Sequence, residues 1–443
     1  MRRWSRIALS AVAVLGVAGT LLAVGAASGS PGAEAPSSAE QDTAAQAGPP
    51  QGRDRLAQDI AGLQATLDRA PGNERAWTEL GFAYVQQARL SADPGLYARA
   101  EGAFAKALAL RPTDNDEALT GQASLAAARH DFAEALALTD RSIAINAYSP
   151  TTFAVRSDAL TELGRYADAQ AAVQTLLDLR PGGLDGLSRA SYVFELRGDV
   201  GRAEELLEQA AEAAVTPPDI AFTEYFRGEL AFNNGDLTAA RAAYDRAIEA
   251  DPTSLQSVAG RAKVLAATGE TTASAADYRT VVERLPLPEY LAGFGELLEA
   301  TGQQQEAEEQ YAVLRATQQL YAAGGQDVDT ELAIFEANHG TPAAALASAE
   351  KAYAKRPQAI FTQDAYAWAL HAAGRSKEAL PIAKTSTRLG LRSPALYYRL
   401  GTIAAAAGDT ATARTALSRA LELNPAFSPL HAPKAQALLK TLR

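Results

Sequence analysis

Several residue types that build functional sites are scarce in this 443-residue sequence, which has no cysteine, one methionine and four histidines. Without cysteine the chain cannot form disulfides, thiolate metal sites, a cysteine nucleophile or a lipid-modified N-terminal cysteine. Glu336 and His339 lie three residues apart, but a closed metal site needs three or four ligands. The sequence therefore predicts no metal and no cofactor.

Positive charge and catalytic motifs are also sparse. The 41 Lys and Arg residues are outnumbered by 52 Asp and Glu residues, which gives a net charge of −11. Nucleic-acid binding needs clustered Lys and Arg, so a nucleic-acid partner is not expected. No G-x-S-x-G elbow, phosphate-binding glycine loop or dinucleotide fingerprint stands in a strand–turn–helix context. The sequence predicts that the chain is not an enzyme.

The first 52 residues differ in composition from the rest. Arg2, Arg3 and Arg6 precede an uncharged apolar run over 7–27, which is typical of an export signal. The run is also long enough to span a bilayer, so 1–27 is either a cleaved signal peptide or an N-terminal anchor. Both readings predict an exported chain, secreted or anchored to the outer face of the cytoplasmic membrane. Residues 28–52, rich in Ala, Gly, Pro and Ser, are expected to be a flexible linker.

From Ala76 to Pro425 one unit of about 34 residues recurs about ten times. Each unit has a small residue inside its first helical pattern, and nine of the units have, seven positions later, a residue that ends the helix. The small residues are Gly81, Ala123, Ser157, Ser191, Gly228, Ala262, Gly295, Ala333, Ala367 and Gly401. The helix-ending residues are His130, Gly164, Gly198, Gly235, Gly269, Gly302, Gly340, Gly374 and Gly408.

The unit over 221–252 shows why each repeat should fold as two paired helices. Gly235 supplies the left-handed conformation that ends a helix at low cost, and Asp236 or Thr238 can cap the next helix. Gly228 lets the two helix axes approach closely. Neighbouring pairs are expected to stack side by side into one continuous curved rod.

The first unit reads Trp77-x-x-Leu80-Gly81-x-x-Tyr84, followed by Ala100-x-x-x-Phe104-x-x-Ala107 and Pro112. This pattern resembles the tetratricopeptide repeat family. The resemblance implies an all-α, right-handed superhelical solenoid of antiparallel helix pairs. We expect an N-terminal capping helix over 53–73, about ten repeats over 74–427 and a C-terminal capping helix over 428–443. Extra residues at 91–97, 216–218 and 322–326 either bend the superhelix or are tolerated surface insertions.

In this family the concave face, lined mainly by the first helices, binds peptides or proteins. Aromatic side chains are favoured at such binding sites, although packing between repeats explains them equally simply. Glu289, Glu296 and Glu299 add acidic character to the same expected face, which favours a basic ligand unless these charges are merely solvated. The aromatic candidates form two sets: Tyr192, Phe222, Tyr225 and Phe232, and then Phe361, Trp368 and Tyr398.

The functional prediction is an exported scaffold or adaptor that binds a peptide segment of a partner protein in its groove. Two alternatives stay open. The array can be a structural spacer or self-assembling part of an envelope complex, or it can deliver a ligand to an envelope enzyme or transporter.

Overall fold

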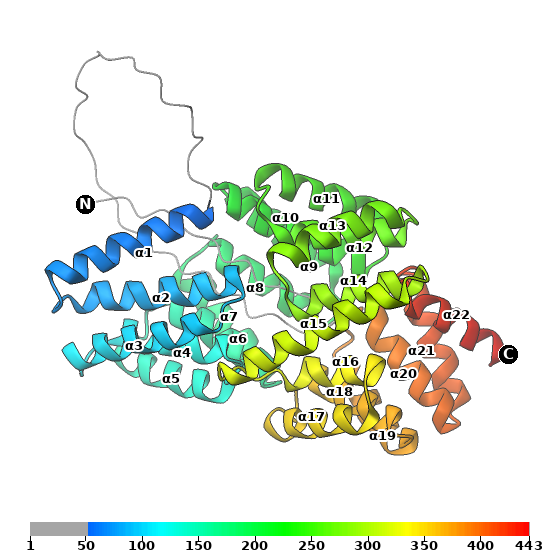
Figure 1. The fold of residues 1–443 in the computed structure, drawn as a ribbon. Helices are drawn as coiled ribbons and strands as arrows, with labels where there is room; N and C mark the ends of the chain where they lie inside the picture. The colour runs from blue at the N-terminus through cyan, green and yellow to red at the C-terminus, as the bar shows by residue number, and fades with distance from the viewer. Residues whose placement is uncertain (1–51, 443) are drawn as a thin grey trace, which may run out of the picture.

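The computed structural model describes residues 52–442, and these residues form helices α1 to α22 and no strand (Figure 1). Ten antiparallel pairs run from α2/α3 to α20/α21, with α1 packed on α2 and α22 packed on α21. The fold is the all-α, right-handed superhelical solenoid that the sequence predicted. Within this part of the chain no helix is both long and apolar enough to cross a membrane. The predicted signal peptide or anchor and nearly all of the predicted linker lie outside the described residues.

The helices are α1 (Gly52–Arg69), α2 (Glu74–Ser91), α3 (Gly95–Leu110), α4 (Asp116–Ala128), α5 (Phe132–Ile145), α6 (Pro150–Glu162), α7 (Tyr166–Leu179), α8 (Leu184–Glu195), α9 (Val200–Ala213), α10 (Pro217–Asn233), α11 (Leu237–Ala250), α12 (Leu255–Ala267), α13 (Thr271–Arg284), α14 (Pro288–Ala300), α15 (Gln304–Ala323), α16 (Asp329–His339), α17 (Pro342–Lys355), α18 (Ile360–Ala372), α19 (Ser376–Ser386), α20 (Pro394–Ala407), α21 (Thr410–Leu423) and α22 (His431–Thr441).

The α10/α11 pair follows the predicted local rules. Gly235 has φ +83° and ends the first helix, and the Asp236 side chain accepts a hydrogen bond from the Ala239 amide to begin the second. A Cβ on Gly228 would lie 2.5 Å from the Tyr244 ring, so the small residue is required by close packing. These contacts confirm the prediction for this repeat.

The helix-ending residues adopt the left-handed conformation in every repeat that has one, with a single exception. Gly340 has φ −126°, because only Gly340 and Thr341 connect α16 to α17, whereas three residues connect α10 to α11. Thr341 caps the N-terminus of α17, where its hydroxyl accepts a hydrogen bond from the Ala344 amide. A shorter connection therefore replaces the left-handed turn in this repeat.

The superhelix coils so tightly that its second turn packs against its first, a contact that the sequence analysis did not predict. His130 contacts the Asp327 carbonyl at 2.8 Å, the Tyr166 hydroxyl accepts from the Ile360 amide at 2.9 Å, and Asn424 donates to a carbonyl of α10 at 2.7 Å. These partners are 197, 194 and 192 residues apart, or about 5.7 repeats of 34 residues. We call this contact between the turns the seam.

The centre of the seam holds a buried ion pair. The Arg356 guanidinium donates to Glu162 at 3.2 Å and to the Thr330 hydroxyl at 2.7 Å, and it lies over the Phe132 ring. Arg356 and Glu162 are both almost fully removed from solvent. The two turns are therefore joined by charge-assisted hydrogen bonds as well as by apolar contact.

Two of the three insertions meet at the seam. A Cβ on Gly324, in the 322–326 insertion, would lie 2.8 Å from Pro94 in the 91–97 insertion. The third insertion begins α10, where Thr216 and Asp219 form a capping box. The insertions at 91–97 and 322–326 thus bring the two turns into contact near the N-terminal end of the array.

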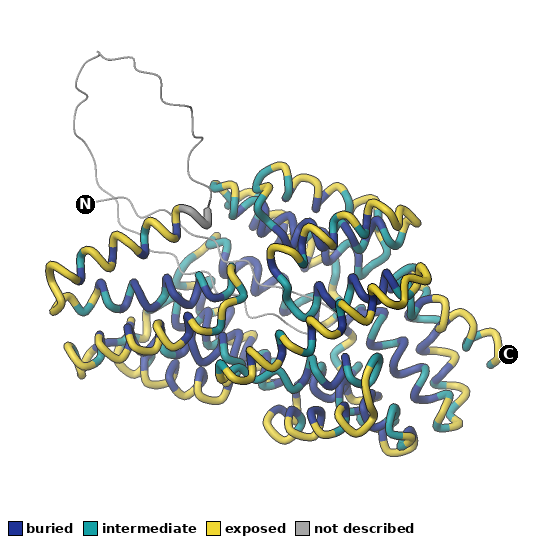
Figure 2. The backbone as a smooth tube through the Cα atoms, in the orientation of Figure 1, coloured by how far each residue is buried: buried dark blue, intermediate teal, exposed yellow. Residues whose placement is uncertain are grey.

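Burial follows the layering of the helices. Figure 2 shows exposed residues along the outer faces of the helix pairs and buried residues where neighbouring helices meet. The buried set is rich in alanine, including Ala123, Ala154, Ala203, Ala240 and Ala307, all at 0% exposure. Small side chains let many helices pack closely.

Candidate functional site

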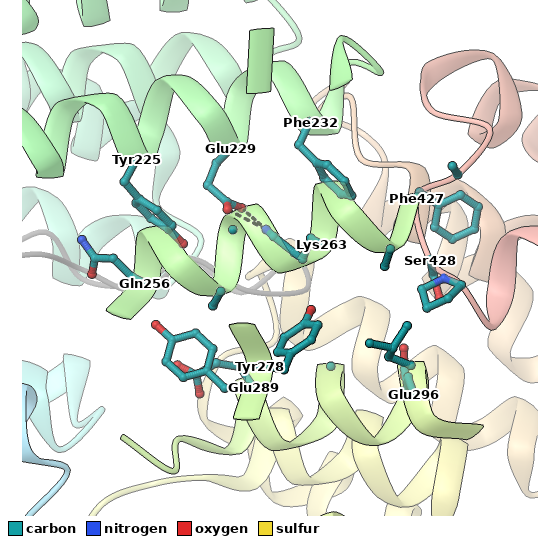
Figure 3. Close-up of a pocket in the computed structure, with 18 residues that line it drawn as sticks. Tyr225, Glu229, Phe232, Gln256, Lys263, Tyr278, Glu289, Glu296, Phe427 and Ser428 are labelled. Atoms are coloured by element: carbon teal, nitrogen blue, oxygen red, sulfur yellow. Dashed lines mark hydrogen bonds and ion pairs between the residues drawn. The ribbon is translucent and has the colours of Figure 1, made fainter. Parts of the chain in front are cut away.

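A cavity opens on the concave face of the fifth, sixth and seventh repeats, and we call it the concave pocket (Figure 3). Three successive first helices each contribute residues at spacings of four and three, which places them on one face of each helix. They are Tyr225, Glu229 and Phe232 of α10; Gln256, Gly260 and Lys263 of α12; and Glu289, Gly293 and Glu296 of α14.

One end of the pocket is formed by the far end of the chain. The segment 426–429, between α21 and α22, faces the three helices, with Phe427 and Ser428 at one end of the pocket (Figure 3). The Asn424 side chain fixes this segment by donating to the Phe232 carbonyl. The pocket therefore exists because the coil brings the last repeat beside the fifth.

The pocket has a volume of about 50 Å³. This is room for a few water molecules or one side-chain head group. It is too small for a folded ligand.

Charge at the centre of the pocket is balanced internally. Lys263 Nζ donates to both carboxylate oxygens of Glu229, at 2.6 and 2.7 Å (Figure 3). The Tyr244 hydroxyl donates to the same carboxylate at 2.7 Å, and Lys263 also lies over the Phe232 ring. Neither charge is left without a partner.

Glu296 is also paired. His339 Nε2 lies 3.3 Å from its carboxylate, and the His339 ring stacks on Tyr311. Burial alone would raise the pKa of Glu296, but His431, the hydrogen-bonded His339 and Lys434 together lower it below the usual value. Glu296 is therefore held in its ionised form.

Glu289 is different from the other two carboxylates. Burial raises its pKa to about 7, and within the described part of the chain no Lys, Arg or His lies at ion-pair distance. Two neighbours in the pocket are also unsatisfied. The Gln256 amide nitrogen and the Tyr290 hydroxyl have no hydrogen-bond partner there, although these side chains are only 7% and 2% exposed.

Buried polar groups are nearly always hydrogen-bonded, because leaving one unpaired costs about 1–3 kcal/mol. Two such groups and a carboxylate with a raised pKa lie together in this cavity.

The predicted aromatic residues are mostly buried, and they group differently from the prediction. Tyr225 and Phe232 line the concave pocket, while Phe222 packs against Phe226 at 4.9 Å. Trp368 and Tyr398 lie 6.1 Å apart in a separate cluster.

The prediction placed Tyr192 with the first set and Phe361 with the second, and this grouping is wrong. Both pack in one apolar cluster around Ile360, because the seam brings the fourth repeat against the ninth. For the seven aromatic residues a role in binding stays a prediction.

Sequence reasoning did not single out Gln256, Lys263, Tyr290 or Phe427. A signal was available for Lys263, since Glu229, Lys263 and Glu296 each follow the small residue of their repeat. When the repeats are aligned, the position after the small residue is negative, positive and negative in the fifth, sixth and seventh repeats. Phe427 carries no such signal because it reaches the pocket only through the coiling of the whole chain.

Glu336 and His339 do not act together. Glu336 accepts from the Thr341 amide and lies 3.5 Å from Arg315, whereas His339 faces Glu296. Among the described residues no group of three His, Asp or Glu side chains is placed to hold a metal ion.

Comparison with family models agrees with this geometry. Models described as tetratricopeptide repeat match residues 155–219, 197–254 and 394–427. The chain is a tetratricopeptide repeat protein. The match over 197–254 includes all of α10, so it overlaps the wall of the concave pocket.

Solved structures similar to this TPR chain include a thermophilic TPR protein of Thermus thermophilus, at 24% identity over 43% of this chain and 98% of that one, with a TM-score of 0.38. A human IFIT1 dimer with PPP-AAAA is 13% identical over 84% of this chain and 93% of that one, with a TM-score of 0.46. The APC/C hetero-tetramer Cut9-Hcn1 is 14% identical over 88% of this chain and 96% of that one, with a TM-score of 0.39. No curated protein matches the TPR chain.

Proposed function

We propose that this TPR chain is a protein–protein interaction scaffold that binds an extended segment of a partner at the concave pocket. The observation that carries the proposal is the pair of buried, unsatisfied groups in that pocket, Gln256 Nε2 and Tyr290 OH. A partner's main chain offers both hydrogen-bond donors and acceptors, so it can satisfy the two groups at once. The small volume fits one anchoring side chain, with the rest of the segment lying across the concave face.

The location of the chain outside the cytoplasm is part of the same proposal. The basic residues before the apolar run of 7–27 support export of the repeats, either as a secreted chain or anchored to the outer face of the cytoplasmic membrane. The partner would then be an extracytoplasmic protein. Fractionation of producing cells tests this location, and recovery of the chain in the cytoplasm alone would contradict export.

Site-specific photo-crosslinking tests the binding site. We expect a photoreactive benzoylphenylalanine in place of Phe427 to crosslink a partner protein in producing cells, because Phe427 lines the pocket. The matched control replaces Tyr148, an aromatic residue that is 80% exposed on the loop between α5 and α6. It should give little or no crosslink to that partner.

Equal crosslinking of the partner from both positions would remove the concave pocket as the binding site. Crosslinks from Phe427 solely to other copies of this chain would contradict the scaffold proposal and favour self-assembly.

A further inference from the structure

The concave pocket contains one carboxylate whose charge the protein does not balance. Glu229 is paired with Lys263, and Glu296 lies 3.3 Å from His339, but Glu289 has no Lys, Arg or His at ion-pair distance among the described residues. Taking a carboxylate out of water without a partner is costly. A cation supplied from outside would remove this cost.

The groups beside Glu289 indicate which kind of cation fits the pocket. The Tyr290 hydroxyl can accept a hydrogen bond, and the Tyr225, Tyr278 and Tyr290 rings line the same cavity. An arginine side chain matches this set, because its planar guanidinium presents several donors and stacks on aromatic faces. The Gln256 amide, by contrast, is a donor, and it suits a main-chain carbonyl next to the side chain.

We propose that the concave pocket binds an arginine side chain of the partner segment, with the guanidinium on Glu289 and Tyr290 and an adjacent main-chain carbonyl on Gln256. This inference rests on the proposed function, and it names the chemistry of the anchoring residue. A carboxylate or phosphate ligand is disfavoured because Lys263, the one Lys or Arg among the described residues that line the pocket, already holds Glu229.

The geometry also gives the pH dependence of binding. The guanidinium needs Glu289 ionised, and burial places the pKa of Glu289 at about 7. The titratable groups that interact with Glu289 from α15 and α16 are the neutral phenol of Tyr321 and the carboxylate of Glu331, and neither supplies positive charge. At the far end of the pocket, His339 and His431 act on Glu296 instead. Affinity should therefore fall as the pH drops below 7.

The test measures binding of a labelled pentapeptide, acetyl-Gly-Gly-Arg-Gly-Gly-amide, to the full-length chain. Its control peptide has citrulline in place of arginine, which keeps the shape but removes the charge. We expect the arginine peptide to bind at least about tenfold more tightly, as one charge-assisted hydrogen-bonded pair implies.

The substitution Glu289→Gln should abolish this difference and also the loss of affinity between pH 7.5 and 5.5. The matched control is Glu283→Gln, which removes the same charge from an exposed site on α13 and should change nothing. Thermal unfolding of both variants checks that they fold. Because Glu289 is uncompensated, its replacement by glutamine should not destabilise the chain.

Equal affinity for the two peptides overturns the inference, as does absence of binding at millimolar peptide, or an equal effect of the two substitutions. The outcome is separable from that of the proposed function. If the Phe427 position crosslinks a partner but the arginine peptide binds no more tightly than the citrulline peptide, the scaffold proposal is supported and the arginine site is contradicted. If there is neither a crosslink to a partner nor a preference for arginine, both proposals are contradicted.

Discussion

Replacing Gly164 with alanine is expected to destabilise the chain by about 3 kcal/mol and to separate the two turns of the superhelix. Gly164 has φ +77°, and a Cβ there would lie 2.3 Å from the carbonyl carbon of Gln358 in the opposite turn. The left-handed conformation costs a non-glycine residue about 1–2 kcal/mol, and overpacking costs about 1–3 kcal/mol more. Because the contact is with backbone, no side-chain rotation can relieve it.

The matched control is Gly269→Ala. Gly269 has φ +85°, but a methyl group added there would meet nothing within 4 Å, so its replacement should cost only the conformational term of about 1–2 kcal/mol. Urea unfolding compares the losses of stability, and small-angle scattering compares the maximum dimension of the folded chains. Equal losses with unchanged dimensions would contradict the close contact at the seam.

Replacing Arg356 with alanine is expected to cost about 3–5 kcal/mol at pH 9, where Glu162 is ionised, which is typical of breaking a buried ion pair from one side. The substitution leaves Glu162 and Thr330 without their partner and removes the cation over Phe132. Arg375→Ala is the control, since its ion pair with Glu378 lies in solvent and should contribute almost nothing. Chemical denaturation measures both.

This loss should also depend on pH. Burial raises the pKa of Glu162 to about 8, above its ordinary value of 4.5, and Arg356 opposes that rise. A carboxyl group whose pKa is raised on folding favours the folded state below pH 4.5, and this contribution is lost as the pH rises towards 8. Without Arg356 the pKa of Glu162 should rise further, so the pH range over which protonated Glu162 favours the folded state should extend to higher pH. A loss for Arg356→Ala that is no larger at pH 9 than at pH 5 would contradict this electrostatic reading.

The repeats and their turns were predictable because they depend on local rules. A glycine such as Gly235 ends a helix wherever it follows an apolar pattern, and a small residue such as Gly228 is needed wherever two axes approach closely. His130 could be identified as the equivalent residue in its repeat only from the period, and it does have a positive φ. Local chemistry thus determines the hairpins.

The coiling could not be predicted in the same way. The rotation between neighbouring repeats is small, and it accumulates over five or six repeats before the turns meet. Contacts such as Arg356 with Glu162 are 194 residues apart and leave no periodic trace in the sequence. For the same reason Tyr192 and Phe361 were assigned to separate sets, although they share one cluster.

The candidate site was predictable only in outline. Tyr225, Phe232, Glu289 and Glu296 were expected on the concave face, and all four line the pocket. Which of the carboxylates lacks a basic partner depends on exact neighbours: Lys263 reaches Glu229, and His339 reaches Glu296, but no Lys, Arg or His among the described residues reaches Glu289. Such differences between equivalent repeat positions emerge only from the folded geometry.

The most direct test of the coiled architecture is the distance between its two turns in solution. The natural chain has no cysteine, so spin labels at Ala167→Cys and Thr385→Cys would be the only two present. Both residues are exposed and line one cavity across the seam. Pulsed electron–electron spin measurements should give a short, narrow distance distribution, comparable in width to a reference pair at Ala167→Cys and Gln174→Cys within α7. A long, broad distribution would show that the turns are apart, and would contradict both the seam and the pocket that depends on it.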